Sequence, residues 1–485
     1  MTAPAATSAT ASPSVVRSTT AGIDASCRLP LFALFGGAAF WLMVGSVLGL
    51  IASIKFHSPK FLADCAWLTY GRVYPASANA LVYGFCVMAG LGVGLWMLAR
   101  LGRVPLARPW LVTVGAKLWH LGVAVGIIGI LAGESTGFEW LEMPGYAALI
   151  LFGAYLLMAA CGFVTHFTRR ERALYPSQWF ILAALFWFPW IYSTANLLLL
   201  EFPVRGVVQG SIQWWFSGNL LFVWLGLLGL GASFYLVPKL SERPLQSHYL
   251  ALFVFWTLIL FATWVGIPAG AALPAWMPAL SAAGALLTLV PAVGAALTII
   301  QTTRGSKVEC LGGPLCYAKF GVWSFVLSII ALAVSSLPQI SRITDLTWFG
   351  TGRTQLLICG FFAMTMFGAV YHILPRITGF VLCPRLVRAH FWCGVIGVLL
   401  FALPLMIGGI AQGLKLANPG IAFVDLAKST MMYLRLSTVG ELLLVAGNGI
   451  FLFNVGAALV RHYRAVCSAA YADATAALQP AEARP

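Results

Sequence analysis

Ionisable side chains inside apolar stretches are the first residues to ask about chemistry. Of the seven histidines, only His120 and His372 lie well within such stretches. Lys117 precedes His120 by three residues, so a helix would place both on one face, and Glu441 lies in another apolar stretch. Ionisable groups in a membrane often mark proton or ion pathways. Proton transfer through Lys117, His120 and Glu441 is therefore one hypothesis.

Structural roles for these residues compete with that hypothesis. Lys117 is near a membrane edge and can extend its amine to the interface. His120 can contact a lipid headgroup or, as a third alternative, bind haem iron alone. Glu441 can form a polar contact with another helix or with a partner subunit. His372 is expected to form hydrogen bonds at a helix end, and the other five histidines are expected at the interface.

The ten cysteines do not form a recognisable metal or redox motif. The sequence contains neither CxxC nor CxxCH, so it has no attachment motif for a covalent haem and no zinc knuckle. Cys310 and Cys316 share a loop, and most of the others lie in apolar stretches as small buried residues do. We therefore expect no disulfide framework.

Composition indicates a membrane protein. Hydrophobic residues make up 60% and charged residues 9% of 485 residues, and the mean hydropathy is +0.90. A soluble domain has about 25% charged residues. The net charge of +15 is typical of cytoplasmic loops of membrane proteins, and we do not read it as nucleic-acid binding.

The apolar stretches predict an all-α polytopic membrane protein with about twelve transmembrane helices. Residues 1–28 and 465–485 are expected to be tails outside a membrane domain at 29–464, with residues 1–28 and the last residues of the chain disordered. The stretches lie near 30–54, 78–100, 109–132, 146–167, 178–200, 212–238, 248–269, 277–300, 317–337, 354–375, 389–413 and 436–460.

Lysine and arginine alternate between the two sets of loops. Most of them fall in one set and in the tails. Because loops rich in Lys and Arg stay on the cytoplasmic side, we expect both termini in the cytoplasm, and the membrane is expected to be a bacterial inner membrane.

Four stretches carry a resemblance to a known family. They are QWFILAALFWFPWIYSTANLLL at 178–199, WWFSGNLLF at 214–222, YLVPKLSERPLQSHYLALFVFW at 235–256 and GFFAMTMFGAVYHILPRITG at 360–379. Together they resemble subunit I of the haem–copper oxidase superfamily, nearest the C-family (cbb-type) cytochrome c oxidases and nitric oxide reductases. The resemblance implies a cytochrome c oxidase subunit I-like bundle, with two haems and a copper held by six histidines.

None of the six family ligand positions is a histidine in this chain. The resemblance places the haem positions on Ser77, Arg353 and Gln355, and the copper positions on Gly218, Pro268 and Ala269. Gly, Ala and Pro offer no ligating side chain, Arg keeps its proton, and Ser and Gln are poor haem ligands. Arg353 is expected to pair with Asp345 or with a carboxylate of a partner.

Three functions remain open from the sequence. The first is a non-catalytic scaffold or accessory subunit of a respiratory electron-transfer complex, without a cofactor, bound to other membrane subunits such as a membrane-anchored cytochrome c. The second is an active terminal oxidase or nitric oxide reductase with haem b and copper. The third is a proton-conducting or transport bundle. We favour the first, because fold does not imply function and oxygen reduction needs redox metals.

Overall fold

The computed structural model is entirely helical over residues 13–478, the part of the chain that it describes, with side chains described for residues 20–475. The α-helices are α1 (Pro13–His57), α2 (Tyr70–Asn79), α3 (Met88–Gly102), α4 (Pro109–Ala132), α5 (Gly145–Phe167), α6 (Pro176–Asn196), α7 (Val207–Gly218), α8 (Leu225–Leu240), α9 (His248–Ala262), α10 (Trp276–Leu287), α11 (Leu289–Thr303), α12 (Pro314–Ser335), α13 (Pro338–Thr344), α14 (Trp348–Gln355), α15 (Met364–Thr378), α16 (Pro384–Leu416) and α17 (Phe423–Leu478). One short 3₁₀ helix, η1 (Ala66–Leu68), and four π-helical segments, η2 (Ala80–Val87), η3 (Leu197–Glu201), η4 (Asn219–Trp224) and η5 (Leu356–Ala363), complete the list.

Eleven helical segments within the described residues are long and apolar enough to cross a membrane. The all-α membrane fold is thereby confirmed. The seventh predicted segment, 248–269, differs, because α9 ends at Ala262 after 15 residues. Gly266, Pro268 and Gly270 follow, and residues of these types end a helix. A helix of 15 residues is about 22 Å long, shorter than the hydrocarbon core.

Three spans form the centre of the bundle. They run through α2–η2–α3, α7–η4–α8 and α14–η5–α15, and 94% of the apolar window of each is buried. For the other spans the buried share is between 33% and 61%. Each central span contains one π-helical segment, a feature that is frequent at functional sites.

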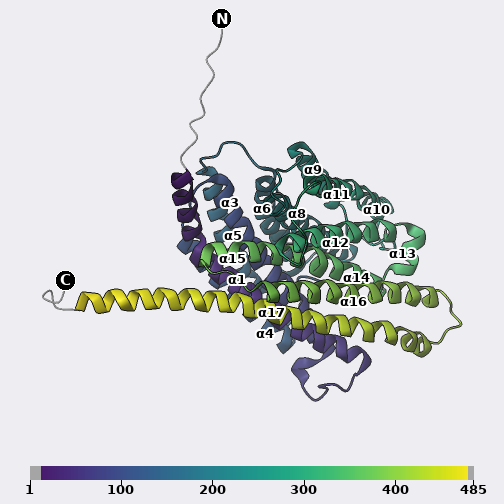
Figure 1. Cartoon of the computed structure of the whole chain (residues 1–485). Coiled ribbons are helices and arrows are strands. Elements are labelled where there is room, and N and C mark those ends of the chain that lie inside the picture. The colour runs from purple at the N-terminus through teal and green to yellow at the C-terminus, as the bar shows by residue number, and fades with distance from the viewer. Residues whose placement is uncertain (1–12, 479–485) are drawn as a thin grey trace, which may run out of the picture.

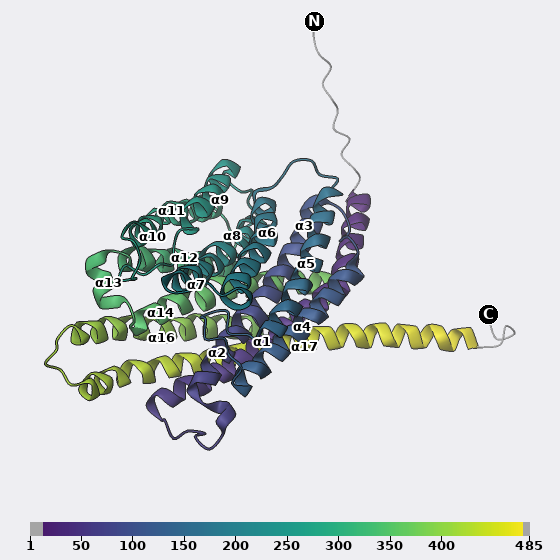
Figure 2. The ribbon, with the colours of Figure 1, turned by 180° about the vertical axis from the view of Figure 1, so that it is seen from behind.

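The remaining helices surround these three spans. Helices α1, α16 and α17 lie side by side along one flank, and α9, α10 and α11 lie together at another edge (Figures 1 and 2). Small residues permit this close packing. The glycines at 397, 408 and 440 meet α16 or α17 directly.

The first helix begins earlier than the sequence suggested. Residues 13–28, expected to belong to a disordered tail, are helical in α1, and residues 1–12 lie outside the described chain. The packing explains the difference. Asp24 forms an ion pair with Arg100 at 3.3 Å, and Arg28 Nε donates to the carbonyl of Ile377 at 2.8 Å.

The last helix also extends past the predicted boundary. Within the expected tail at 465–485, α17 continues to Leu478, and residues 479–485 lie outside the described chain. Alanine-rich sequence such as residues 468–477 has high helix propensity. Figure 1 shows this end of α17 projecting from the bundle.

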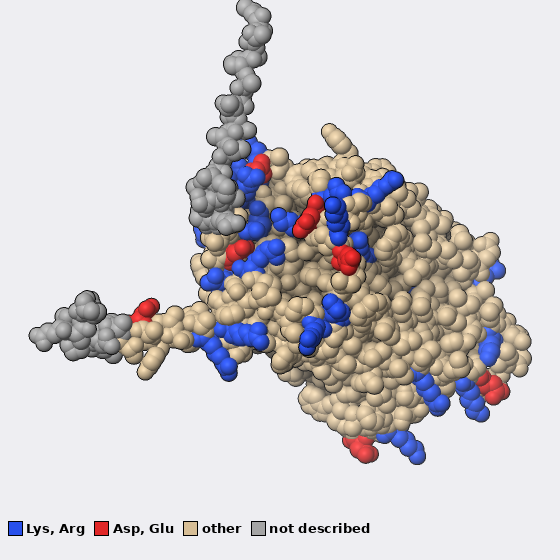
Figure 3. Space-filling model, in the orientation of Figure 1, with Lys and Arg blue, Asp and Glu red and all other residues tan. Residues whose placement is uncertain are grey.

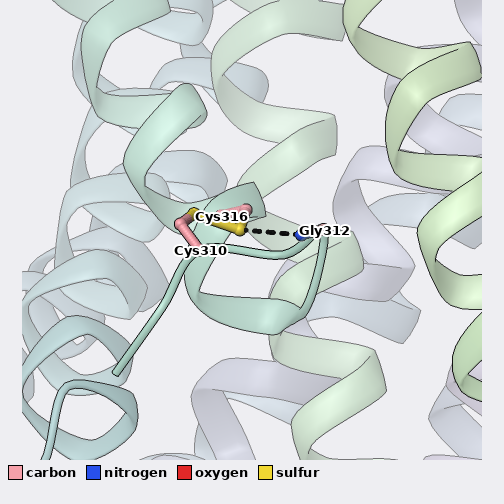
Figure 4. The surroundings of a disulfide bond; sticks show 3 residues. All are labelled: Cys310, Gly312 and Cys316. Carbon is pink, nitrogen blue, oxygen red and sulfur yellow. Dashed lines mark hydrogen bonds between the residues drawn. A yellow bond between two sulfur atoms is a disulfide. The ribbon is translucent and has the colours of Figure 1, made fainter. Parts of the chain in front are cut away.

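One disulfide is present that the sequence did not predict. Cys310 and Cys316 are bonded, with their Cα atoms 5.4 Å apart. The chain reverses at Gly312, whose φ of +79° favours glycine, and the Gly312 amide donates to Cys316 Sγ at 3.1 Å (Figure 4). A turn of this kind brings two cysteines together without a recognisable spacing motif. The other eight cysteines are free.

Candidate functional site

The six predicted ligand positions lie in the N-terminal halves of the central spans and in the chain that follows α9. Ser77 lies three residues before η2, Gly218 directly precedes η4, and Gln355 directly precedes η5. The three polar or small residues therefore stand where each central span changes its helical geometry. The sequence carried no signal for the π-helical segments themselves.

Ser77 and Gln355 line the same cavity. Two adjoining hollows of about 60 Å³ each share Ser77, Gln355 and Glu441 among their lining residues. Ser77 Oγ donates to the carbonyl of Tyr74 at 2.8 Å, and Gln355 Oε1 accepts from Cys359 Sγ at 3.4 Å. Both side chains are thus already engaged within their own helical spans. Hollows of this size hold a few water molecules.

Arg353, Pro268 and Ala269 line a second, larger cavity of about 410 Å³. Arg353 Nη1 donates to Ser335 Oγ at 2.9 Å, and its guanidinium carbon lies 6.0 Å from the centre of the Phe222 ring. The Nε of Arg353 is buried and has no hydrogen-bond partner. The second cavity therefore contains a fixed cation where the resemblance places a haem ligand.

The expected ion pair between Arg353 and Asp345 does not form. The two ion pairs within the described residues are Arg100–Asp24 and Arg103–Glu171. Asp345 does line the same cavity. Burial raises the pKa of Asp345 and the charge of Arg353 opposes that rise, so the two groups interact at longer range. The extended backbone of Asp345 at the end of α13 separates it from α14.

Gly218 lies in direct contact with the chain that follows α9. A Cβ atom at position 218 would be 1.9 Å from the carbonyl oxygen of Val265 and 3.3 Å from the Cα atom of Gly266. Asn219 reinforces this contact, because its Nδ2 donates to the carbonyl of Thr263 at 3.1 Å. No side chain longer than hydrogen fits at position 218 without a shift of the backbone.

The polar residues Lys117, His120 and Glu441 do not form one pathway. Lys117 is exposed on α4. His120 Nδ1 accepts from Trp41 Nε1 at 3.1 Å, whereas Glu441 faces the hydroxyl of Ser53. Trp41 and Ser53 are both on α1, and the twelve residues between them correspond to about 18 Å. The structure therefore separates His120 from Glu441.

Several histidines that we expected at the interface are buried. His166, His390 and His462 are each less than 10% exposed. His390 is the most informative, because it lines the cavity of Ser77 and Gln355 while its Nδ1 lies 2.8 Å from Tyr371 Oη. Its position six residues into α16 suggested a helix end, but aromatic side chains of α12, α15 and α17 cover that turn. His372 is buried against Trp96.

The residues present do not fit the metals that the resemblance implies. Within the described chain, no group of three or more His, Cys, Asp or Glu side chains is placed to hold one metal ion. The backbone contact at Gly218 occupies the space that a copper-ligating side chain would need. A haem is also far larger than the hollows beside Ser77 and Gln355. We therefore derive no chemical step through a haem or a copper.

Comparisons with known proteins agree on the fold. The family described as "Cytochrome C and Quinol oxidase polypeptide I" matches residues 30–443. A cytochrome c oxidase subunit 1 homolog of Azorhizobium caulinodans is 24% identical over 447 residues, covering 87% of this chain and 80% of the relative. The Cbb3-type cytochrome c oxidase subunit CcoN1 of Stutzerimonas stutzeri is 26% identical over 462 residues, covering 90% of this chain and 95% of the relative.

A solved structure supports the same assignment of the fold. A cryo-EM structure of a heme-copper terminal oxidase dimer matches with a TM-score of 0.71 and 14% sequence identity, covering 89% of this chain and 84% of the matched chain. Together with the family match, this confirms the resemblance that the sequence motifs suggested. The chain belongs to the cytochrome c and quinol oxidase polypeptide I family.

Proposed function

We propose that this chain is a non-catalytic, oxidase subunit I-like membrane protein that serves as a scaffold or accessory subunit of a respiratory electron-transfer complex. The observation that carries the proposal is the backbone contact at Gly218, where a Cβ would lie 1.9 Å from the Val265 carbonyl. A histidine at that position would have to displace the chain after α9. Ser77, Arg353, Gln355, Pro268 and Ala269 add no good iron or copper ligand.

Its partners are other membrane subunits, such as a membrane-anchored cytochrome c. The bundle offers them many large apolar side chains on helix faces that surround the central spans. Lipid covers such faces in the isolated chain, and a second subunit can replace the lipid. A catalytic subunit or an electron donor held in this way would supply the redox chemistry that the chain itself lacks.

The competing function is an active terminal oxidase or nitric oxide reductase with haem b and copper. The names of the relatives favour it. An alkaline pyridine haem spectrum and a copper analysis of the purified chain, expressed alone in a haem-sufficient host, separate the two functions. We expect neither cofactor. The CcoN1 relative, prepared in the same way, is the control for cofactor loading by the host.

Stoichiometric haem in the chain would overturn the proposal. The partner is then sought by purification of the chain from its native membrane. We expect a haem-containing partner to co-purify, visible as a haem band that migrates apart from this chain.

A further inference from the structure

The two adjoining hollows between α1, α2, α14–η5, α16 and α17 form one cavity. His390 lines the first hollow, and Glu441 lines both hollows. Each hollow of about 60 Å³ has room for about four waters at 10–15 Å³ of probe volume each. Ser77, Gln355 and Asn448 supply further polar atoms along the wall. The cavity is therefore large enough and polar enough to hold a short row of waters.

His390 lines this cavity and has a buried ring nitrogen without a hydrogen-bond partner. The side chain is 1% exposed, and its Nε2 is buried without a partner. Tyr371 Oη accepts from Asn454 Nδ2 at 3.2 Å and lies 2.8 Å from His390 Nδ1. When the Tyr371 hydroxyl donates to Nδ1, the neutral imidazole carries its own hydrogen on Nε2. That buried N–H group needs an acceptor, which a water in the cavity would provide.

Glu441 connects the cavity with the outer end of α1. Its carboxyl is 9% exposed and faces the hydroxyl of Ser53. Ser53 Oγ and Thr438 Oγ1 are 2.7 Å apart, and Thr438 Oγ1 is 3.2 Å from His57 Nε2. His57 is partly exposed. These hydroxyls and the imidazole form a continuous polar connection from the surface to the buried carboxyl.

The two ends of the cavity are close enough for water to connect them. Gly447 lies beside His390 and follows Glu441 by six residues, which corresponds to about 9 Å along α17. At the His390 end of this path, Asn448 Nδ2 donates to Ser46 Oγ at 2.7 Å. Two or three waters span about 9 Å at ordinary hydrogen-bond distances.

Among the side chains that the structure describes, no basic group neutralises Glu441 from the helices packed against it. The titratable groups that interact with its carboxyl are Tyr70 and Tyr74 of α2 and Cys359 of η5. From α1 it meets Ser53, with His57 further out beside Arg435 of α17. Of the described α16 residues that line the cavity, His390 is the titratable one. A buried carboxyl without a counter-charge is poised to carry a proton.

We propose that this cavity is a hydrated proton-binding site, in which Glu441 takes up protons from the outer face through Thr438 and Ser53 and shares them with His390 through water. The ligand is therefore the hydrated proton. The site goes beyond the scaffold function and does not depend on it. It does not use Lys117, which is exposed on α4. Nor does it use His120, whose partner Trp41 is separated from Ser53 by about 18 Å along α1.

Infrared difference spectroscopy of the full chain in liposomes, between acid and alkaline buffer, tests the proposal. We expect a C=O band of a protonated carboxyl that moves in D₂O. The band should be lost in Glu441→Gln, displaced in Glu441→Asp and unchanged in the control Lys117→Met. His390→Gln should shift the frequency or the midpoint of the band. Thr438→Val should slow the exchange of the carboxyl proton of Glu441 with D₂O.

Two results would overturn the proposal. One is the absence of any titrating carboxyl band that is present in the parent and missing in Glu441→Gln. This comparison requires that both proteins are folded, as judged by the same elution volume in gel filtration and the same helical circular dichroism spectrum. The other is a Glu441 band that neither His390→Gln nor Thr438→Val alters, because the carboxyl would then be isolated from the proposed path. Haem and copper content tests the scaffold function separately, so a failure of one proposal is distinguishable from a failure of the other.

Discussion

The first residue-scale prediction concerns Gly218, where the backbone after α9 leaves no room for a copper-ligating side chain. The Gly218→Ala variant adds a Cβ that would lie 1.9 Å from the Val265 carbonyl oxygen. We expect a loss of about 1–3 kcal/mol in stability, because overpacking forces a backbone shift. Gly449→Ala is the matched control, since nothing lies within 4 Å of its added Cβ. Thermal unfolding in detergent compares the two, and an equal midpoint for both variants would contradict the contact.

A second residue-scale prediction concerns Glu142 in the loop before α5. Burial raises its pKa from 4.5 to about 7, although the Asn79 amide opposes the rise by donating to its Oε2 at 2.7 Å. Below pH 4.5 the carboxyl is neutral in both the folded and unfolded states. As the pH rises through about 7, the folded state must carry a buried charge, which costs on the order of 3 kcal/mol.

The stability of the parent protein should therefore fall between about pH 4.5 and pH 7. Glu142→Gln keeps the acceptor for Asn79 and removes the charge, so its stability should fall less over the same interval. The measurement is the unfolding midpoint against pH for both proteins. Parallel pH profiles would show that Glu142 does not titrate as its burial requires.

At the scale of elements, one hydroxyl binds two backbone amides of the chain between α9 and α10. Ser281 Oγ of α10 accepts from the amides of Gly266 at 3.2 Å and Ile267 at 3.0 Å. Ser281→Ala should expose residues 263–275 to faster hydrogen exchange, because two amides lose their acceptor at a cost of about 1–3 kcal/mol each when buried. Ser135→Ala is the control, since Ser135 accepts from Gly137 at an exposed site. Equal exchange of 263–275 in both variants would contradict the role of Ser281.

The elements also show what the sequence could and could not predict. Hydropathy located the membrane helices and the motifs located the family, because both depend on residue type along the chain. The end of α9 at Ala262 was missed, since an apolar run continues past the helix to Ile267. The path from His57 to His390 was also missed. It joins α1, α16 and α17, and its serines, threonines and asparagines look unremarkable until the helices are packed together.

At the scale of the whole molecule, exposed cysteines can report the orientation in the membrane. Lys and Arg side chains are frequent on the upper left of the molecule, near the ends of the described chain (Figure 3), as the expected cytoplasmic location of both termini requires. Cys65, Cys383 and Cys467 are exposed. A membrane-impermeant maleimide should label Cys65 from outside intact cells, and Cys383 and Cys467 only in inverted vesicles.

Single-cysteine versions of the protein make this measurement unambiguous. Cys383 should react fastest at neutral pH, because the amides of Arg385 and Leu386 lower its pKa and the thiolate is the reactive form. A parent version without Cys65, Cys383 and Cys467 provides the background. Labelling of Cys467 in intact cells would reverse the predicted topology.

The length of α17 has a consequence for electrostatics. The eighteen helical residues from Arg461 to Leu478 extend for about 27 Å beyond the predicted membrane segment. At physiological ionic strength the surface potential of a membrane decays over about 8 Å. A domain bound at Leu478 would therefore stand more than three decay lengths from the lipid headgroups, where the charge of the bilayer no longer selects its binding partner.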